Sequence, residues 1–184
     1  MNVSNQHTCH IGQKRRNKLK TLLEAGHPMS TVRIICKTDG LCESAFEGGP
    51  QTPGGVATYG FFICDDEGRP IAKDSGVIGE GAEMNHMVAE YEAVLQALRY
   101  LLKEKRTKDP VVVQNDNQQL VLEMKGEREF GEGLHETRYY QAKRLTSQFR
   151  SICYTQVDRE VIWEADCLTW KEYRRYLSEK NSVI

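Results

Sequence analysis

The chain has 184 residues, of which 39% are hydrophobic and 28% charged, and its formal net charge is −1. These values are ordinary for a globular protein that buries a sizeable core, and they exclude binding to polyanions through overall charge alone. The six cysteines form no CxxC pair and no regular framework, and no apolar stretch is long enough for a signal peptide or a membrane span. We therefore expect a cytoplasmic protein without membrane contact.

Residues 1–30 are predicted to be a basic N-terminal extension. Five basic residues crowd together ahead of a few leucines in one short predicted helix: Lys14, Arg15, Arg16, Lys18 and Lys20. Two interpretations stay open, a solvated and partly frayed helix or a basic arm that contacts phosphates. Residues 31–184 are predicted to form the main domain.

Within that domain, alternating and apolar segments predict five strands and four helices. The predicted strands, in chain order, are 32–38, 56–64, 69–79, 111–114 and 150–157. The predicted helices are 87–105, 118–126, 134–149 and 163–177. A Gly/Pro-rich loop precedes the second strand, and "DDEG" with Gly68 predicts a hairpin turn before the third. Hairpin strands followed by alternating strands and helices favour an α/β fold, a mixed sheet flanked by helices.

Two apolar runs end on an aspartate. "VRIICKTDG" ends at Asp39, and the valine run in "VVVQNDNQQL", predicted to be buried on both faces, ends at Asp116. If these strands are adjacent and parallel, both carboxylates lie together at the carboxyl edge of the sheet. Each acid could instead be a helix cap or an ordinary loop residue.

The helix predicted over 87–105 supplies another acid. At 100° per residue its apolar stripe includes Tyr91, Val94 and Leu98. Glu92 falls on the opposite, solvent-facing side, whereas Glu90 falls at the border of the stripe and can reach the strand ends. Asp166, in the last helix, would add a fourth acid. Four clustered carboxylates would suit two magnesium ions about 3.5–4 Å apart, because hard oxygen ligands suit that ion.

Residues 31–177 resemble type 1 ribonuclease H, particularly its bacterial and archaeal reverse-transcriptase-like branch, which lacks the histidine-bearing loop. The resemblance rests on segments in the family's order: "TDGLCE", "PGGVATYGFFI", "MNHMVAEYEAVLQAL", "NDNQQLVLEMKGE" and "VDREVIWEADCLTW". The fold that it implies is a five-stranded mixed sheet with helices on both faces.

The resemblance also implies a site and an activity. Its catalytic, metal-binding acids match Asp39, Glu90, Asp116 and Asp166, and its substrate contacts match Gly40, Asn85, His86 and Asn117. The implied reaction is hydrolysis of the RNA strand of RNA/DNA hybrids by a monomeric endonuclease with two Mg²⁺ ions, for which Mn²⁺ can substitute. Glu90 would also help to recognise a ribose 2′-OH.

Some positions depart from the family pattern. The usual Thr-Asn-Asn triplet is Asn85, His86 and Met87 here, the loop from Ser44 to Thr52 is longer, and no histidine lies between Phe149 and Asp166. His86 and His135 are the nearest histidines that could take a site role. Two alternatives therefore stay open: a nucleic-acid-binding module with weak or no catalysis, and a nuclease of the same fold that acts on DNA or other RNA.

Overall fold

The computed structural model describes residues 32–43 and 55–182. The basic extension 1–30 and the long loop at Ser44–Thr52 lie outside these described residues. The described elements are β1 (Ile34–Glu43), β2 (Val56–Asp65), β3 (Pro70–Glu80), α2 (His86–Lys103), β4 (Pro110–Asn115), α3 (Gln118–Lys125), α4 (Glu136–Thr146), β5 (Ser151–Gln156), the 3-10 helix η1 (Arg159–Ile162) and α5 (Trp163–Asn181). The strands and helices predicted for residues 31–184 are confirmed, with boundaries that move by a few residues.

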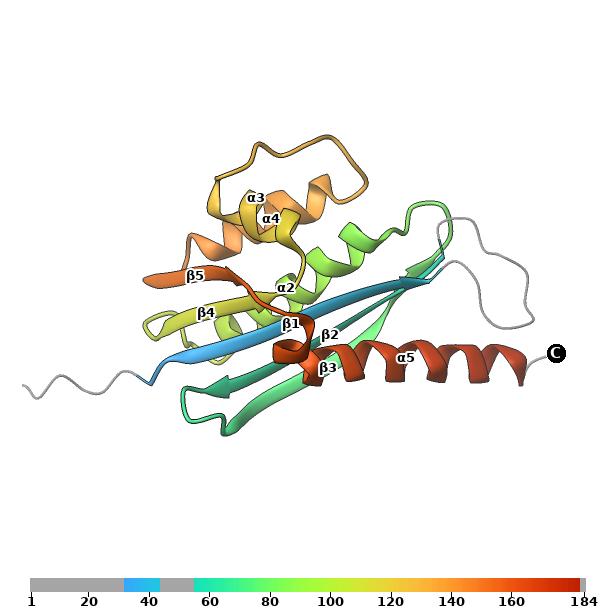
Figure 1. Ribbon diagram of the computed structural model, residues 1–184, viewed down its shortest axis with the longest axis horizontal. Coiled ribbons are helices and arrows are strands. Elements are labelled where there is room, and N and C mark those ends of the chain that lie inside the picture. Colours follow the sequence, from blue (N-terminus) through green and yellow to red (C-terminus); the bar gives the residue numbers. More distant parts are fainter. Residues whose placement is uncertain (1–31, 44–54, 183–184) are drawn as a thin grey trace, which may run out of the picture. The chain divides into compact units, whose positions relative to one another are not determined.

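The strands form one mixed sheet in the order β3-β2-β1-β4-β5 (Figure 1). β1, β2 and β3 are antiparallel, whereas β1, β4 and β5 are parallel. The predicted hairpin turn is confirmed: Gly68 has a φ of 80°, and Asp65 Oδ1 accepts hydrogen bonds from the backbone N–H groups of Glu67 and Arg69. The mixed sheet expected from the element order is therefore present.

Successive residues of β1 point to opposite faces of the sheet, and each face has its own helices. Ile34 and Cys36 belong to the main core, which α2, α3 and α4 help to form. Lys37 and Leu41 face α5 instead, where Lys37 pairs with Glu164 and Leu41 packs with Tyr173. Helices therefore cover both faces (Figure 1).

β1 is longer than the sequence predicted, so Asp39 does not end it. The parallel pairing with β4 runs only from Ile34–Val111 to Lys37–Gln114, while the antiparallel pairing with β2 continues to Glu43. Asp39 thus lies in the middle of β1, just beyond the last paired residue of β4. The early end of β4 leaves a notch in the sheet beside the second half of β1.

The valine run was predicted to be buried on both faces, and this is wrong. Val111 and Val113 are buried, but Val112 between them is only half-buried. α5 contacts β1, β2 and β3 rather than β4, so it leaves the second face of β4 incompletely covered. One face of β4 is therefore fully covered, and the other is partly open to solvent.

The helical wheel was also wrong about Glu92. Its carboxylate is only 13% exposed, because it accepts hydrogen bonds from Arg99 at 3.0 Å and Arg138 at 2.8 Å. Arg138 belongs to α4, which packs beside α2 and so covers the side that a lone helix would expose. Cys36, Cys64 and Cys153 lie in apolar stretches, which predict buried thiols; Cys36 and Cys64 are buried, but Cys153 is exposed.

Candidate metal centre

Asp39 reaches the notch from the face of the sheet that α5 covers. Its side chain is 1% exposed and accepts a hydrogen bond of 2.9 Å from the Thr169 hydroxyl. Burial and the nearby carboxylates of Glu90 and Asp116 together raise the pKa of Asp39 to about 7, against the opposing effects of Thr169 and Arg159. A cation close to so deeply buried a carboxylate would stabilise its charged form.

Glu90 reaches the same notch from α2, on the other face. It is fully buried, and its Oε2 accepts a hydrogen bond of 2.8 Å from Asn115 Nδ2. His86 Nε2 lies 3.1 Å from Oε1, but no hydrogen bond of good geometry reaches that oxygen from the described residues. Burial raises the pKa of Glu90, while the contact with His86 opposes the rise. Among the described residues, Glu90 Oε1 is therefore a buried acceptor that lacks a well-formed hydrogen bond.

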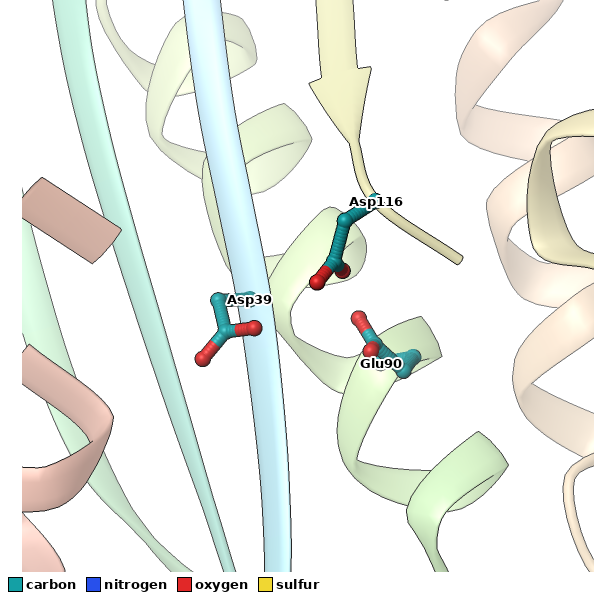
Figure 2. A group of neighbouring side chains, drawn as sticks. All are labelled: Asp39, Glu90 and Asp116. Carbon is teal, nitrogen blue, oxygen red and sulfur yellow. The ribbon is translucent and has the colours of Figure 1, made fainter. Parts of the chain in front are cut away.

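Asp116 follows the last residue of β4 directly and completes a group of three acids. Oxygen atoms of Asp39, Glu90 and Asp116 all lie within 4.8 Å of one another (Figure 2). The predicted proximity of the two aspartates at adjacent parallel strands is thus confirmed. Three buried or half-buried carboxylates at this distance repel one another unless a cation lies between them, and hard oxygen donors suit divalent ions such as Mg²⁺ or Mn²⁺.

The notch depends on Asn115, which the sequence analysis did not single out. Its side-chain nitrogen lies 3.0 Å from the Thr38 carbonyl oxygen and 2.8 Å from Glu90 Oε2, and its oxygen accepts a hydrogen bond from the Asn117 backbone. The amide thereby joins β1, α2 and the end of β4. The only signal in the sequence was its position next to Asp116, because an amide that ends an apolar run also fits a simple turn.

Asp166, the fourth predicted acid, does not belong to this group of three. Its carboxylate accepts a hydrogen bond from Arg159 Nη2, and Arg159 Nη1 lies 3.9 Å from Asp116 Oδ2. The guanidinium therefore lies between the two aspartates. The sequence analysis noted Arg159 only as part of a motif, and its contacts show that it offsets charge at one side of the centre.

The four predicted substrate-contact residues have different surroundings. Gly40 is buried against the α2 backbone, Asn85 caps α2 by accepting from Val88 N, and Asn117 caps α3 by accepting from Leu120 N. These three have structural roles in the fold, and their contact with substrate stays a prediction. His86, with 55% of its side chain exposed beside Glu90, is the most accessible of the four.

His135, the other histidine considered for a site role, is buried elsewhere. Its ring stacks on Tyr91, and its Nε2 lies 3.9 Å from Glu123 Oε2. Burial lowers the pKa of His135, with Glu123 opposing the fall. His135 therefore belongs to the packing between α2, α3 and α4.

Comparisons with known proteins agree with this fold. The model of the family described as "Reverse transcriptase-like" matches residues 46–171, which include Glu90, Asp116 and Asp166 but begin after β1. A search of the curated proteins finds no match. Among the helices of residues 55–182, none has the length and apolar character needed to cross a membrane.

Solved structures resemble the chain over about three quarters of its length. The N-terminal RNase H domain of a Mycobacterium tuberculosis protein is 28% identical, with a TM-score of 0.64 over 76% of this chain and 98% of that one. LC11-RNase H1, crystallised with an RNA/DNA hybrid, is 26% identical, with a TM-score of 0.67 over 78% and 99%. RNase H1 from Halobacterium salinarum, at 22% identity and a TM-score of 0.63 over 78% and 98%, shares the fold. The chain has the ribonuclease H-like α/β fold.

Proposed function

Because this chain belongs to the Reverse transcriptase-like family, we propose that it is a metal-dependent endonuclease that hydrolyses the RNA strand of RNA/DNA hybrids. The observation that carries the proposal is the meeting of Asp39, Glu90 and Asp116 within 4.8 Å, from three different elements of the fold. A fold needs no three buried like charges for its stability, since each costs free energy without a cation.

The donor set fits divalent metal ions. Asp39, Glu90 and Asp116 would hold the metal, with Asp166 as the fourth acid on the side of Arg159. Two bound Mg²⁺ ions would supply the acidity that generates a nucleophilic water and stabilises the leaving oxygen. The three grouped carboxylates are suited to hold a metal ion. The identity of the ion and the number of ions are part of the proposal.

The protein's own side chains prepare this site. Thr169 donates to one oxygen of Asp39 and Asn115 to one oxygen of Glu90, and these bonds restrict the rotation of both carboxylates. Arg159 holds Asp166 near Asp116 by pairing with it and partly offsets the charge of the four acids. These contacts keep the four carboxylates in fixed positions. Precise positioning of a phosphodiester requires such rigid groups.

The preference for RNA would arise next to Glu90. A protein distinguishes RNA from DNA by its contact with the ribose 2′-OH, which both donates and accepts hydrogen bonds. Glu90 accepts such a bond, and exposed His86 one turn away offers a second polar group. The LC11-RNase H1 structure with an RNA/DNA hybrid supports this class of substrate. We also propose that the protein is a type 1 enzyme of the branch without the histidine loop. It would work as a cytoplasmic monomer with a basic N-terminal extension.

The test compares cleavage of labelled RNA/DNA hybrid, double-stranded DNA and single-stranded RNA, each with Mg²⁺ or Mn²⁺. Glu90→Gln keeps the size and the hydrogen bond from Asn115 but removes the charge, and we expect at least a 100-fold loss of hybrid cleavage. Glu92→Gln, two residues away and paired with Arg99 and Arg138, is the matched control and should retain most activity.

Three outcomes would overturn the proposal in different ways. Cleavage of DNA or single-stranded RNA in preference to the hybrid would leave the chemistry and change the substrate. Hybrid binding without cleavage under either metal would identify a binding module. Equal activity of Glu90→Gln and the unaltered protein would exclude the carboxylate group as the active site.

A further inference from the structure

The outer face of α5 carries a hollow that contains two basic side chains. The hollow has a volume of about 370 Å³, and its described lining residues all belong to α5: Asp166, Cys167, Trp170, Lys171 and Arg174. α5 runs beside the second half of β1, because Thr169 bonds to Asp39 and Tyr173 packs on Leu41. One lining residue, Asp166, is linked to the centre, because Arg159 pairs with it and also lies 3.9 Å from Asp116 Oδ2.

Its basic residues differ from the others on the same helix. Arg175 pairs with Glu172 and Glu179, and Lys180 pairs with Glu80. Lys171 and Arg174 are exposed, and among the described residues neither has an acidic partner within ion-pair distance. The positive charge of the hollow is thus not neutralised by the described part of the protein.

The single acid of the hollow does not cancel this charge. Asp166 is paired with Arg159, which lies outside the hollow. Two basic side chains therefore face solvent beside a neutralised carboxylate. This arrangement suits an anion with repeated charges, and the backbone of a nucleic acid is such a ligand.

Aromatic side chains add a second feature. The Arg174 guanidinium lies 5.9 Å from the Trp170 ring centroid, so Trp170 forms an apolar wall and also holds the arginine. Trp163, in the first turn of α5, is 58% exposed. Basic groups interleaved with aromatic rings are typical of surfaces that bind single strands, whose unpaired bases have free faces for stacking.

We propose that the α5 hollow binds a single-stranded extension of the same strand whose phosphate the acids hold. This inference rests on the proposed nuclease function and adds a substrate preference to it. Asp166 and Arg174 are eight residues apart, about 12 Å along the helix. Lys171 and Arg174 contact phosphates, and Trp170 lies against a sugar or an unpaired base.

The experiment is a competition between hybrids in one tube. A blunt hybrid is mixed with hybrids that carry a 5′ or 3′ overhang on the RNA strand, or an overhang on the DNA strand, each with its own fluorophore. The ratio of kcat/KM values gives the preference. We expect the protein to prefer one of the RNA overhangs by about 3- to 10-fold, as two exposed charge contacts would supply.

Charge reversal then locates the preference. Lys171→Glu with Arg174→Glu should remove the preference and make the slope of log affinity against log salt smaller by about 1.4 for the single strand. Lys73→Glu with Lys103→Glu changes the net charge equally at exposed residues of β3 and α2, and should keep the preference. The double variant Lys171→Ala with Arg174→Ala tests whether a fold defect, rather than the lost charge, explains the result of the charge reversal. It should also lose the preference.

The outcomes separate this inference from the proposed function. Cleavage of all hybrids with no overhang preference, or with one that the charge reversal leaves unchanged, overturns the inference alone. A preference for the DNA-strand overhang overturns the assignment of the strand. If no hybrid is cleaved, the proposed function fails, and direct binding of the labelled single strand to the two double variants decides whether the hollow binds nucleic acid.

Discussion

Gly40 of β1 and Glu90 of α2 meet at backbone contact. A Cβ atom on Gly40 would lie 2.2 Å from the Glu90 backbone nitrogen and 2.3 Å from the carbonyl carbon of Ala89. Only a residue without a side chain lets α2 lie this close to β1. The contact brings Glu90 into the notch where β4 ends, so Gly40 sets the position of the candidate metal centre without contributing a ligand.

Gly40→Ala should therefore damage both stability and the site. The new methyl group meets backbone rather than a flexible side chain, so α2 must move, and we expect a loss of about 1–3 kcal/mol in the free energy of unfolding. Urea denaturation measures it. Gly131→Ala is the control, because its Cβ would meet nothing within 4 Å, and its effect should stay within about 0.5 kcal/mol. Equal effects of the two changes would contradict the close contact.

The raised pKa of Asp39 predicts a pH dependence of stability. Its folded-state pKa of about 7 lies above the ordinary 3.8, so the folded protein holds an extra proton between these values. The metal-free protein should accordingly lose stability as pH rises from about 4 to about 7. Asp39→Asn, which still accepts from Thr169, removes the charge and should stabilise the metal-free protein at pH 8 by about 1–3 kcal/mol.

The effect of divalent ions on the Tm is a complementary measurement. At pH 8, Mg²⁺ or Mn²⁺ should raise the Tm of the unaltered protein by binding only the folded state, and should have little effect on Asp39→Asn. At pH 5.5, where Asp39 is protonated, the rise should shrink. A Tm rise that is the same at both pH values, or in both proteins, would mean that the ion binds elsewhere.

Local sequence pattern predicted the meeting of Asp39 and Asp116 on the condition that their strands are adjacent and parallel, as they are. Both follow apolar runs, and two parallel neighbours in a sheet necessarily bring such positions together. The helical wheel similarly separated Glu90 from Glu92, because the angle between two residues of one helix is fixed. These predictions needed only the geometry of single elements and one strand pairing.

Features that depend on contacts between distant segments were beyond that reasoning. Glu92 is paired because α4 packs beside α2, and Arg159 lies between Asp116 and Asp166 because η1 places it there. Asn115 joins three elements through one amide. None of these contacts has a periodicity or a spacing in the sequence, so only the assembled fold reveals them.

Tyr91, next to Glu90, should matter for stability rather than chemistry. Its hydroxyl donates a hydrogen bond of 2.6 Å to Glu123, a carboxylate that is fully buried. Tyr91→Phe leaves that carboxylate with one donor fewer, which should cost about 1–3 kcal/mol in chemical denaturation while metal binding persists. Tyr140→Phe, at a residue 58% exposed, is the matched control and should be nearly neutral. A neutral Tyr91→Phe would mean that Glu123 is satisfied by other groups.

Arg159 should weaken metal binding at the centre that it helps to organise. Its guanidinium lies 3.9 Å from Asp116 and pairs with Asp166, and it opposes the raised pKa of Asp39. Arg159→Met removes this competing charge, and at pH 8 the affinity for Mg²⁺ measured by calorimetry should rise about 3- to 10-fold, a modest effect because the side chain is half exposed.

Arg175→Met provides the control for Arg159, because Arg175 pairs with Glu172 and Glu179, neither of which belongs to the carboxylate group. It should leave the metal affinity unchanged. If Arg159→Met instead weakens metal binding, the guanidinium's main effect is to hold Asp116 and Asp166 in place rather than to compete with the ion. Asp166 would then contribute to metal binding only while Arg159 holds it near Asp116.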